Sequence, residues 1–417
     1  MRYFEMKGIF RFLSGIMGIT WLLWGGCRPT IKEHDQSLSD ITVIDLNTLE
    51  EADLLLSHHR VDSLRKFAFQ GHVMTVADGW PDSLRIIKLE TSADCLLGAI
   101  KKIRFVDSLI FISDYNDHLY VFDSSGSFRN PIGELGRAPN QVVALSSFYV
   151  DRKRKVVGVY DGYSDCIHRY TFDGIKQDKI SCRNEVNGYI LDVNQIDDNE
   201  ILLTLSSGVG DLYNYAVVSA KDYKLKEYIL PYNLRYLENS SRGELSCLAQ
   251  PNGQLWLTAL LSDTIYEYKA GKMLSRFVVK SDCMSLNDRV FESHKEWISP
   301  AHASAFLRDN GYSQGLMAIW ATDQYLQFDL SYKDAGYSVY YDYLNHKGYK
   351  SKQYSRGNVL MPGRFLTSDA FVSYVTAYDF IHQPEGCIDV DRPLWRDLRE
   401  RTMEDDNPIL LLYYIRK

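Results

Sequence analysis

The stretch SLIFISDYNDHLYVFDSSG (108–126) decides the fold class of this chain, because its pattern predicts two short β-strands and two turns. An apolar run ends at Asp114, an Asp-rich turn follows, and a second apolar and aromatic run ends in an Asp and a Gly turn. KVVGVYDGYSDCIHRYTFDG (155–174) repeats this order, with Asp161 at the end of its first run. Runs of Val, Ile, Tyr and Phe bounded by Gly, Asp, Asn and Ser are typical of strands joined by tight turns.

Looser copies extend the repeat along the chain, at 200–215, 253–271 and 315–329. In all five copies an aromatic residue closes the second run, and these residues recur at intervals of 45 to 60 residues: Phe122, Tyr170, Tyr215, Tyr268 and Phe328. Self-similarity near 50 residues, with about four short strands per period, is the signature of a β-propeller blade.

The C-terminal region indicates how such a ring closes. A sixth first strand stands at 369–379, and a helical insertion is expected at about 391–403, with Pro393 at a plausible helix start. An apolar strand follows at about 408–416, and an N-terminal strand at 83–90 can join it to complete the last blade. This pairing would leave no open sheet edge within the ring.

The fold that follows is all-β, a six-bladed β-propeller over residues 41–417 with a short C-terminal helix inserted before the closing strand. A seven-bladed ring that counts residues 41–80 is an alternative, and so is a pair of β-sandwiches.

The N-terminus has the features of an export signal followed by a lipid-attachment site. Residues 1–26 place basic residues before the apolar run FLSGIMGITWLLWGG, whose length suits a signal peptide. Two glycines before Cys27 resemble a bacterial lipobox, whose cysteine carries diacylglycerol, although Trp24 stands where Leu is usual. The polar residues 27–40 would then tether the fold to the membrane. An uncleaved anchor helix is the alternative.

Charge and cysteine usage exclude some classes of function. Lys and Arg number 47 against 54 Asp and Glu, for a net charge of −7, and no basic cluster is dense enough to follow a phosphate backbone. We therefore expect no nucleic-acid partner. Of the seven cysteines, the six beyond Cys27 are widely spread without metal-ligand spacing, which favours buried thiols and leaves any pairing open.

Four segments resemble the six-bladed propeller lipoproteins that are abundant in Bacteroidetes, distant relatives of the NHL-repeat propellers. They are IIKLETSADCLLGAIKKI (86–103), SDYNDHLYVFDSSGSF (113–128), IGELGRAPNQV (132–142) and EDDNPILLLYYI (404–415). The likeness covers about residues 40–417 and implies a cell-envelope, outer-membrane lipoprotein, in a family whose members mostly lack an assigned activity. Ala138 and Gln141 depart from the Gly and Glu of the family's blade connection, so a ligand role that needs a carboxylate at 141 is in doubt.

Acidic residues in the predicted turns are the first binding candidates. A propeller would gather them on one face, where a ring of carboxylates can bind a cation or a basic ligand. Asp at a strand end, however, usually accepts hydrogen bonds from local backbone N–H groups. The turn acids are Asp114, Asp117, Asp161, Asp165, Asp211, Asp263 and Asp323, and the ligand-binding candidates among them are Asp114, Asp161, Asp263 and Asp323.

Arg137 is the remaining binding candidate, because its guanidinium on a blade connection could grip a carboxylate or a phosphate. Its alternative role is to hold neighbouring blades together through loop carbonyls. The 29 tyrosines exceed the need of a core, and the segment 337–354 is the best candidate for stacking sugars or binding peptides.

Catalysis has little support in the sequence. His294 and His302 flank a long connection and could form a metal or acid–base pair, although solvated loop histidines are the simpler interpretation. No GxSxG, HExxH, P-loop or dinucleotide fingerprint is present, so we expect no catalytic residue, metal or cofactor.

Three functions remain open. The first is a monomeric, lipid-anchored propeller that binds an unknown ligand (a glycan, a peptide or an envelope protein) on one face of the ring. The second is a hydrolase or lyase, which needs at least three of the named Asp or His side chains to converge at the channel mouth. The third is a scaffold within a larger envelope complex.

Overall fold

The computed structural model describes a large part of the chain between Ile41 and Tyr414, all of it within one compact unit, Leu38–Lys417. The described ranges are 41–51, 66–69, 72–75, 83–183, 185–206, 213–231, 248–250, 254–259, 261–269, 271–284, 300–332, 335–353, 365–367, 369–382 and 393–414. The predicted signal peptide, tether and Cys27 lie outside these ranges.

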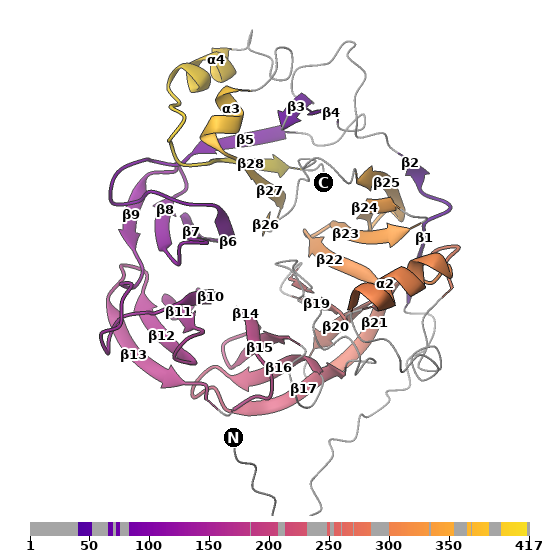
Figure 1. The fold of residues 1–417 in the computed structure, drawn as a ribbon, viewed down its shortest axis with the longest axis horizontal. Coiled ribbons are helices and arrows are strands. Elements are labelled where there is room, and N and C mark those ends of the chain that lie inside the picture. The colour runs from indigo at the N-terminus through magenta and orange to yellow at the C-terminus, as the bar shows by residue number, and fades with distance from the viewer. Residues whose placement is uncertain are drawn as a thin grey trace, which may run out of the picture. The chain divides into compact units, whose positions relative to one another are not determined.

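The described strands form six blades around a common axis, with the first strand of each blade innermost (Figure 1). Blade 1 consists of β6 (Ile100–Val106), β7 (Leu109–Asp114), β8 (Leu119–Asp123) and β9 (Phe128–Pro131). Blade 2 consists of β10 (Leu145–Asp151), β11 (Val156–Asp161), β12 (Cys166–Thr171) and β13 (Lys176–Ser181). Blade 3 consists of β14 (Ile190–Gln195), β15 (Glu200–Leu205), β16 (Tyr213–Ser219) and β17 (Leu225–Pro231).

The second half of the ring carries the C-terminal blades. Blade 4 consists of β18 (Leu248–Ala249), β19 (Leu255–Thr258), β20 (Thr264–Lys269) and β21 (Lys272–Lys280). Blade 5 consists of β22 (Leu316–Ala321), β23 (Tyr325–Tyr332), β24 (Ala335–Asp342) and β25 (Lys347–Gln353). Blade 6 consists of β26 (Phe365–Leu366), β27 (Ala370–Val375), β28 (Ile409–Tyr414) and β5 (Ser83–Lys88). The predicted all-β, six-bladed propeller is confirmed.

Blade 6 closes the ring as the sequence predicts. The C-terminal strand β28 lies between β27 and the N-terminal strand β5, and both pairings are antiparallel. Ile409 faces Lys88 and Tyr414 faces Ser83, so the whole of β28 pairs with β5. The backbone of β28 is therefore hydrogen-bonded on both sides.

Residues 42–51 do not build a seventh blade. β1 (Thr42–Asp45) adds to the outer strand β21 in parallel, and β2 (Glu50–Glu51) adds to β25 in the same way. Blades 4 and 5 thereby gain a fifth, outermost strand each (Figure 1). A separate hairpin, β3 (Lys66–Phe69) with β4 (His72–Thr75), lies in the sequence between these strands and β5.

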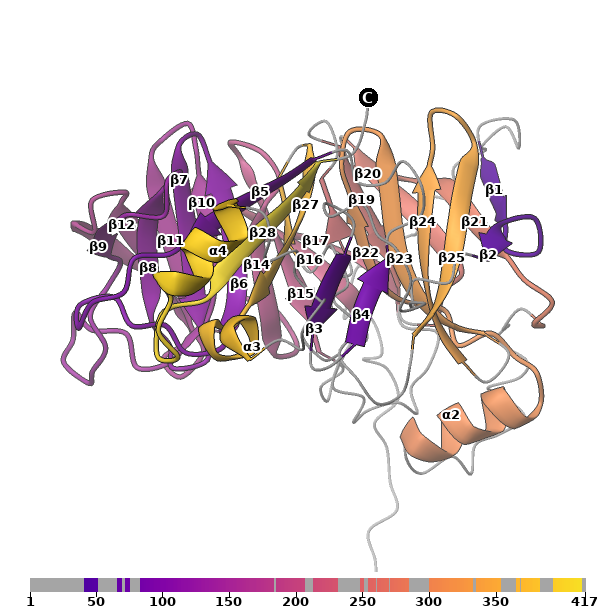
Figure 2. The same ribbon diagram turned by 90° about the horizontal axis from the view of Figure 1, so that it is seen from above.

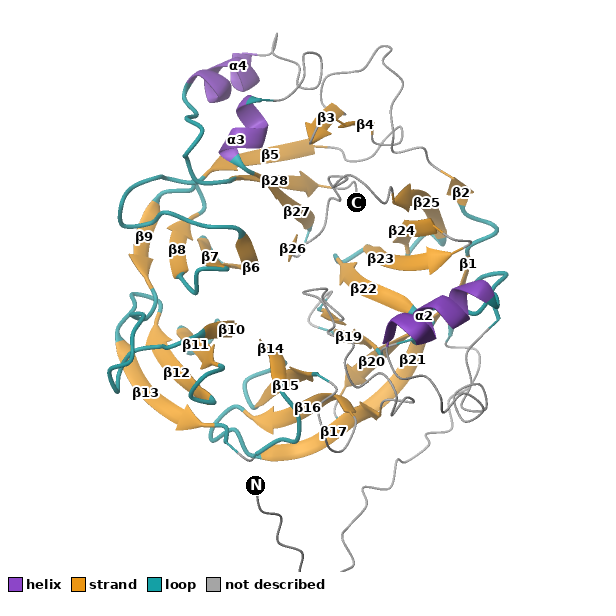
Figure 3. Ribbon diagram, viewed as in Figure 1, coloured by secondary structure: helices purple, strands orange, loops and turns teal. Residues whose placement is uncertain are grey.

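Three helices accompany the described strands (Figure 3). α4 (Pro393–Glu400) begins at the expected proline and, with α3 (Ala377–Ile381), lies between β27 and β28 in the chain. α2 (Pro300–Asp309) was not expected, although Pro300 at its first position is a common helix-start signal. Figure 2 shows α3 and α4 beside β28. No helix in the described ranges is both long and apolar enough to cross a membrane.

Apolar side chains fill the seams between neighbouring blades. Phe111 of blade 1 packs with Phe148 and Val159 of blade 2, and Trp256 of blade 4 packs in one cluster with Ile319 of blade 5. The periodic aromatic residues are all buried, at 4% exposure or less: Phe122, Tyr170, Tyr215, Tyr268 and Phe328. The aromatic residues that recur in the sequence thus recur in the core, where these large side chains pack between neighbouring blades.

One repeat copy, at residues 315–329, corresponds to a different pair of strands from the other four. Residues 315–329 match β22 and β23, the first and second strands of blade 5, whereas the earlier copies match second and third strands. Phe328 is consequently on a second strand. The difference matters because successive turns of an antiparallel blade lie at opposite edges.

The closing strand offers a direct test of ring stability. Leu410→Ala removes a fully buried side chain of β28 from the cluster between blades 6 and 1, and should lower the free energy of unfolding by about 2–5 kcal/mol. Leu344→Ala, at a side chain that is 62% exposed, should change it by less than about 0.5 kcal/mol. Urea unfolding measures both, and equal effects would contradict the role of β28.

Candidate functional site

Asp114 is held by backbone amides at the end of β7. Its carboxylate accepts hydrogen bonds from the backbone N–H groups of Gly98 (2.9 Å), Asn116 (3.0 Å) and His118 (2.9 Å), and it is 0% exposed. The His118 ring nitrogen Nδ1 lies 3.1 Å from its second oxygen. Because its oxygens are engaged and shielded from solvent, Asp114 serves the turn and the preceding blade connection.

Asp161 has the same role at the end of β11. It accepts from the N–H groups of Val143 (3.2 Å) and Ala144 (3.1 Å), which join blade 1 to blade 2, and from the Ser164 hydroxyl (2.8 Å). Burial raises the pKa of Asp161, but the bonds from Ser164 and the backbone outweigh it, so the pKa lies below the usual value. A carboxylate held in this way stabilises the connection.

The other candidate acids do not converge on these two. The face that carries the turns between second and third strands, together with the connections between blades, is called the connection face here. Asp114, Asp161 and Asp263 lie at this face, where Asp263 Oδ1 accepts a hydrogen bond from the Ser313 hydroxyl. Burial raises the pKa of Asp263 despite that bond.

Asp323 lies at the opposite face, so the expectation that the turn acids gather on one face is wrong for this residue. It stands between β22 and β23, a turn between first and second strands. Antiparallel strands alternate in direction, so this turn cannot share an edge with the turn after Asp114. Asp211 lies outside the described residues.

Arg137 is exposed on the connection between β9 and β10. This connection is shaped by Gln141, whose Oε1 accepts a hydrogen bond from the Ala138 N–H (3.0 Å), and whose own N–H donates to the Ala138 carbonyl (2.9 Å). The amide oxygen of Gln141 thus satisfies the turn by itself. Neither of these two hydrogen bonds involves Arg137, and neither brings a second ligand-binding group beside it.

The histidines and thiols form no metal centre in the described ranges. No three His, Cys, Asp or Glu side chains there come together as metal ligands. His294 is outside those ranges, and Cys95, Cys166 and Cys182 are buried free thiols, with Cys283 partly buried. The convergence of named Asp and His side chains that the hydrolase or lyase hypothesis requires is not seen among them.

A polar cluster near the axis was not predicted from the sequence. It consists of Lys102 and Arg104 on β6, Ser147 on β10, and Asp192 and Asn194 on β14, and it is called the axial cluster here. These are the innermost strands of blades 1, 2 and 3 (Figure 1). Its members are far apart in the chain and meet only because the ring brings the three first strands side by side.

Lys102 is the hub of the axial cluster. Its Nζ lies 2.6 Å from Asp192 Oδ1, 3.1 Å from the Ser147 hydroxyl and 3.3 Å from Asn194 Oδ1, and it donates to the Val193 carbonyl at 2.9 Å. An ammonium has three N–H donors, so Lys102 is fully satisfied. The lysine side chain therefore joins three blades at the axis.

Burial and mutual electrostatic interaction shift the pKa values of the charged residues in the axial cluster. Burial lowers the pKa of Lys102 to about 7, because desolvation and the repulsion of Arg104 outweigh the attraction of Asp192. Burial also lowers the pKa of Arg104, against the attraction of Asp192. For Asp192, burial raises the pKa, but Lys102 and Arg104 outweigh it and the net pKa is lowered.

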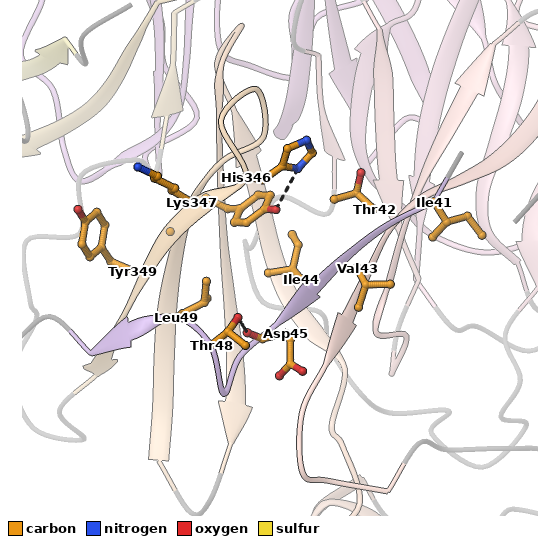
Figure 4. Close-up of a pocket in the computed structure, with 12 residues that line it drawn as sticks. Ile41, Thr42, Val43, Ile44, Asp45, Thr48, Leu49, His346, Lys347 and Tyr349 are labelled. Carbon is orange, nitrogen blue, oxygen red and sulfur yellow. Dashed lines mark hydrogen bonds between the residues drawn. The ribbon is translucent and has the colours of Figure 1, made fainter. Parts of the chain in front are cut away.

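A separate hollow of about 700 Å³ lies at the rim of blade 5, between the segment Ile41–Leu49 and β24–β25 (Figure 4). It is called the rim hollow here. One side carries Ile44 and Leu49, and the other carries Tyr341, Lys347 and Tyr349. The Tyr341 hydroxyl lies 3.4 Å from His346 Nδ1. The rim hollow and the axial cluster share no residue.

Comparison with known proteins places this chain in a family. A family model described as a domain of unknown function, DUF4934, matches residues 74–414. The chain belongs to this family. The match begins within β4 and ends at the last residue of β28, so it contains the four main strands of each blade and does not include β1, β2 or Cys27.

Solved structures share the fold at low sequence identity. A Bacteroides fragilis protein whose name describes it as exported is 18% identical, with a TM-score of 0.68 over 90% of this chain and 100% of that chain. A DUF4221-family protein from Bacteroides vulgatus is 10% identical, with a TM-score of 0.53 over 84% of this chain and 98% of that chain. No curated protein matches the chain.

The sequence predicts part of one of the two candidate regions, the rim hollow. The segment 337–354, singled out for its tyrosines, supplies Tyr341, His346, Lys347 and Tyr349 to the rim hollow. The sequence carried one signal of the axial cluster, since charged residues at 102 and 104 would point to the same side of any strand that contains both. Their partners on other blades left no trace in the local pattern.

Buried His168 makes the fold sensitive to acid. It is 0% exposed, its Nε2 has no hydrogen-bond partner, and its Nδ1 lies 3.2 Å from Lys176 Nζ. Burial, with added repulsion from Lys176, lowers the pKa of His168 to about 4. In the unfolded chain His168 is protonated below about pH 6.5, whereas in the folded chain it stays neutral down to about pH 4. The free energy of unfolding therefore falls as the pH drops from 6.5 to 4.

We predict that His168→Gln removes this component. Between pH 7 and pH 4.5 the unmodified protein should lose up to about 3 kcal/mol more unfolding free energy than the variant, as measured by urea unfolding. His382→Gln, at an exposed histidine, is the matched control and should follow the unmodified protein. Parallel pH profiles for all three proteins would contradict the prediction.

Proposed function

We propose that this protein is a lipid-anchored cell-envelope propeller that binds a short peptide in the rim hollow. Three observations support the envelope location. Cys27 follows an apolar run and two small residues, the family match begins well after it, and a similar fold occurs in a Bacteroides fragilis protein described as exported. A lipid on Cys27 would hold the ring at the membrane without taking part in the fold.

The rim hollow is the observation that carries the binding function. Its volume of about 700 Å³ lies within the usual range of 300–1,000 Å³ for ligand pockets. Aliphatic Ile44 and Leu49 line it together with two tyrosines, which suits an apolar side chain better than a sugar ring. Val43 is 55% exposed and Tyr349 is 37% exposed, so both remain open to a partner.

Charge at the rim hollow favours an acidic residue in that peptide. Asp45 is already paired with Lys280, at 3.6 Å, and it also accepts a hydrogen bond from the Asn47 N–H. Lys347 is exposed and forms no ion pair in the described part of the chain. A carboxylate beside the apolar side chain would find its partner there.

Lipid attachment is tested at Cys27. Cys27→Ser should abolish labelling by a fatty-acid probe in a bacterial host and release the protein from the membrane fraction. Cys283→Ser, a partly buried thiol within the ring, should leave both unchanged. Retention of the Cys27→Ser variant in membranes would contradict the lipid anchor and favour an uncleaved N-terminal helix instead.

Peptide binding is tested at Tyr349. Display selection against the purified protein should yield peptides with an apolar and an acidic residue, and Tyr349→Ala and Lys347→Ala should each weaken them about tenfold or more in calorimetric titrations. Leu344→Ala, exposed on the adjacent turn outside the rim hollow, should bind as the unmodified protein does. Selection of glycans instead, or peptides insensitive to both variants, would overturn the assignment.

A further inference from the structure

With Lys102 protonated, the axial cluster contains one more positive charge than it can neutralise. In that state Lys102 and Arg104 carry two positive charges and Asp192 carries one negative charge, while Ser147 and Asn194 are neutral, which leaves a balance of +1. Asp192 lies 2.6 Å from Lys102 and pairs with it. In the part of the chain that the structure describes, no carboxylate forms an ion pair with Arg104. A cation removed from bulk water without a partner is unfavourable, so the cluster favours an anion.

The donors that remain belong to Arg104. Its guanidinium donates to the Ile103 carbonyl at 3.0 Å and to Asn194 Oδ1 at 2.6 Å, which uses two of five N–H groups. Lys102, by contrast, has a partner for every proton. The remaining N–H groups of Arg104 form a fork of the kind that binds planar oxyanions through two parallel hydrogen bonds.

We propose that Arg104 is the anchor of an axial site for the carboxylate of a small molecule, held by the surplus positive charge of the axial cluster. The balance of +1 matches a monoanion, and the nearby Asp192 disfavours a phosphate dianion. Solvent reaches the edge of the axial cluster, since the Asp192 side chain is 31% exposed, whereas that of Lys102 is only 10% exposed. It is independent of the rim hollow and does not rest on the proposed peptide binding.

The site explains the arrangement of its neutral members. Asn194 accepts from Arg104 through Oδ1 and donates to Asp192 Oδ2 at 2.8 Å, so it lies between the guanidinium and the carboxylate of the axial cluster. Ser147 donates to Asp192, which keeps that carboxylate turned toward blade 2 and Lys102. Arg104 is thereby oriented without being neutralised, as a binding residue requires.

The direct test is calorimetric titration of the purified full chain in mild detergent with propionate, at constant ionic strength and with chloride as the reference anion. The unmodified protein should bind propionate saturably, and Arg104→Gln should weaken binding about tenfold or more. Arg152→Gln is the matched control, because it removes the same charge from an exposed arginine already paired with Asp107. Equal binding by Arg104→Gln, or an equal loss in Arg152→Gln, would overturn the proposal.

Two further arms separate the alternatives. Inorganic phosphate should bind more weakly than propionate, and tighter phosphate binding would overturn the assignment to a carboxylate. Arg104→Lys keeps the charge but lacks the fork, so it should fold and bind propionate more weakly than the unmodified protein. This variant carries the test if Arg104→Gln does not fold, and undiminished binding by it would exclude the bidentate contact.

Proton uptake gives an independent readout. An anion beside Arg104 opposes the repulsion that helps to lower the pKa of Lys102 to about 7, so binding at pH 7.5 should draw protons from the buffer. Titrations in two buffers with different ionisation enthalpies measure that uptake. No uptake at pH 7.5, with binding intact, would place the anion away from the axial cluster.

Discussion

The pairing of β28 with β5 is the constraint on which the rest of this structure depends. Six residue pairs join Ile409–Tyr414 to Ser83–Lys88, so strands more than 300 residues apart in the sequence meet in one blade. Without this pairing, blade 6 would lack its outer strand and the ring would end in an exposed edge. Closure therefore needs no strand from before residue 83, and β1 and β2 extend blades 4 and 5 as their outermost strands.

Closure also creates chemistry that no single blade contains. Each first strand faces the axis, so side chains from blades that are 45 residues or more apart in sequence become neighbours, as Lys102, Ser147 and Asp192 do. The six first strands have diverged, however. β22 reads LMAIWA and offers no charge, whereas β6 reads IKKIRFV. Among the described first strands, charged residues lie only on those of neighbouring blades 1, 2 and 3.

The blades could be predicted because each strand and turn is specified by residues close together in the sequence. The candidate sites could not, because their residues come from segments that are far apart in the sequence. Alternating apolar residues around Asp114 and Asp161 specify strands and turns within 20 residues, and the apolar C-terminal run could serve only as a strand. The same period of two residues cannot distinguish first from second strands, which put Asp323 at the wrong face. β1 and β2 are too short for a pattern, and IKKIRFV looks like an ordinary strand with solvated cations until blades 2 and 3 are in place.

The distribution of charge separates structural from functional residues in this fold. Asp114 and Asp161 are surrounded by backbone N–H groups of the connections they stabilise, and Gln141 performs the same task with a neutral amide. Lys102 is saturated as well, so its low pKa reflects burial in a structural junction. Arg104 differs from all of these, because it is positioned by neutral acceptors and keeps both its charge and several donors. Because no carboxylate in the described part of the chain forms an ion pair with Arg104, a bound carboxylate would supply the negative charge that the axial cluster lacks.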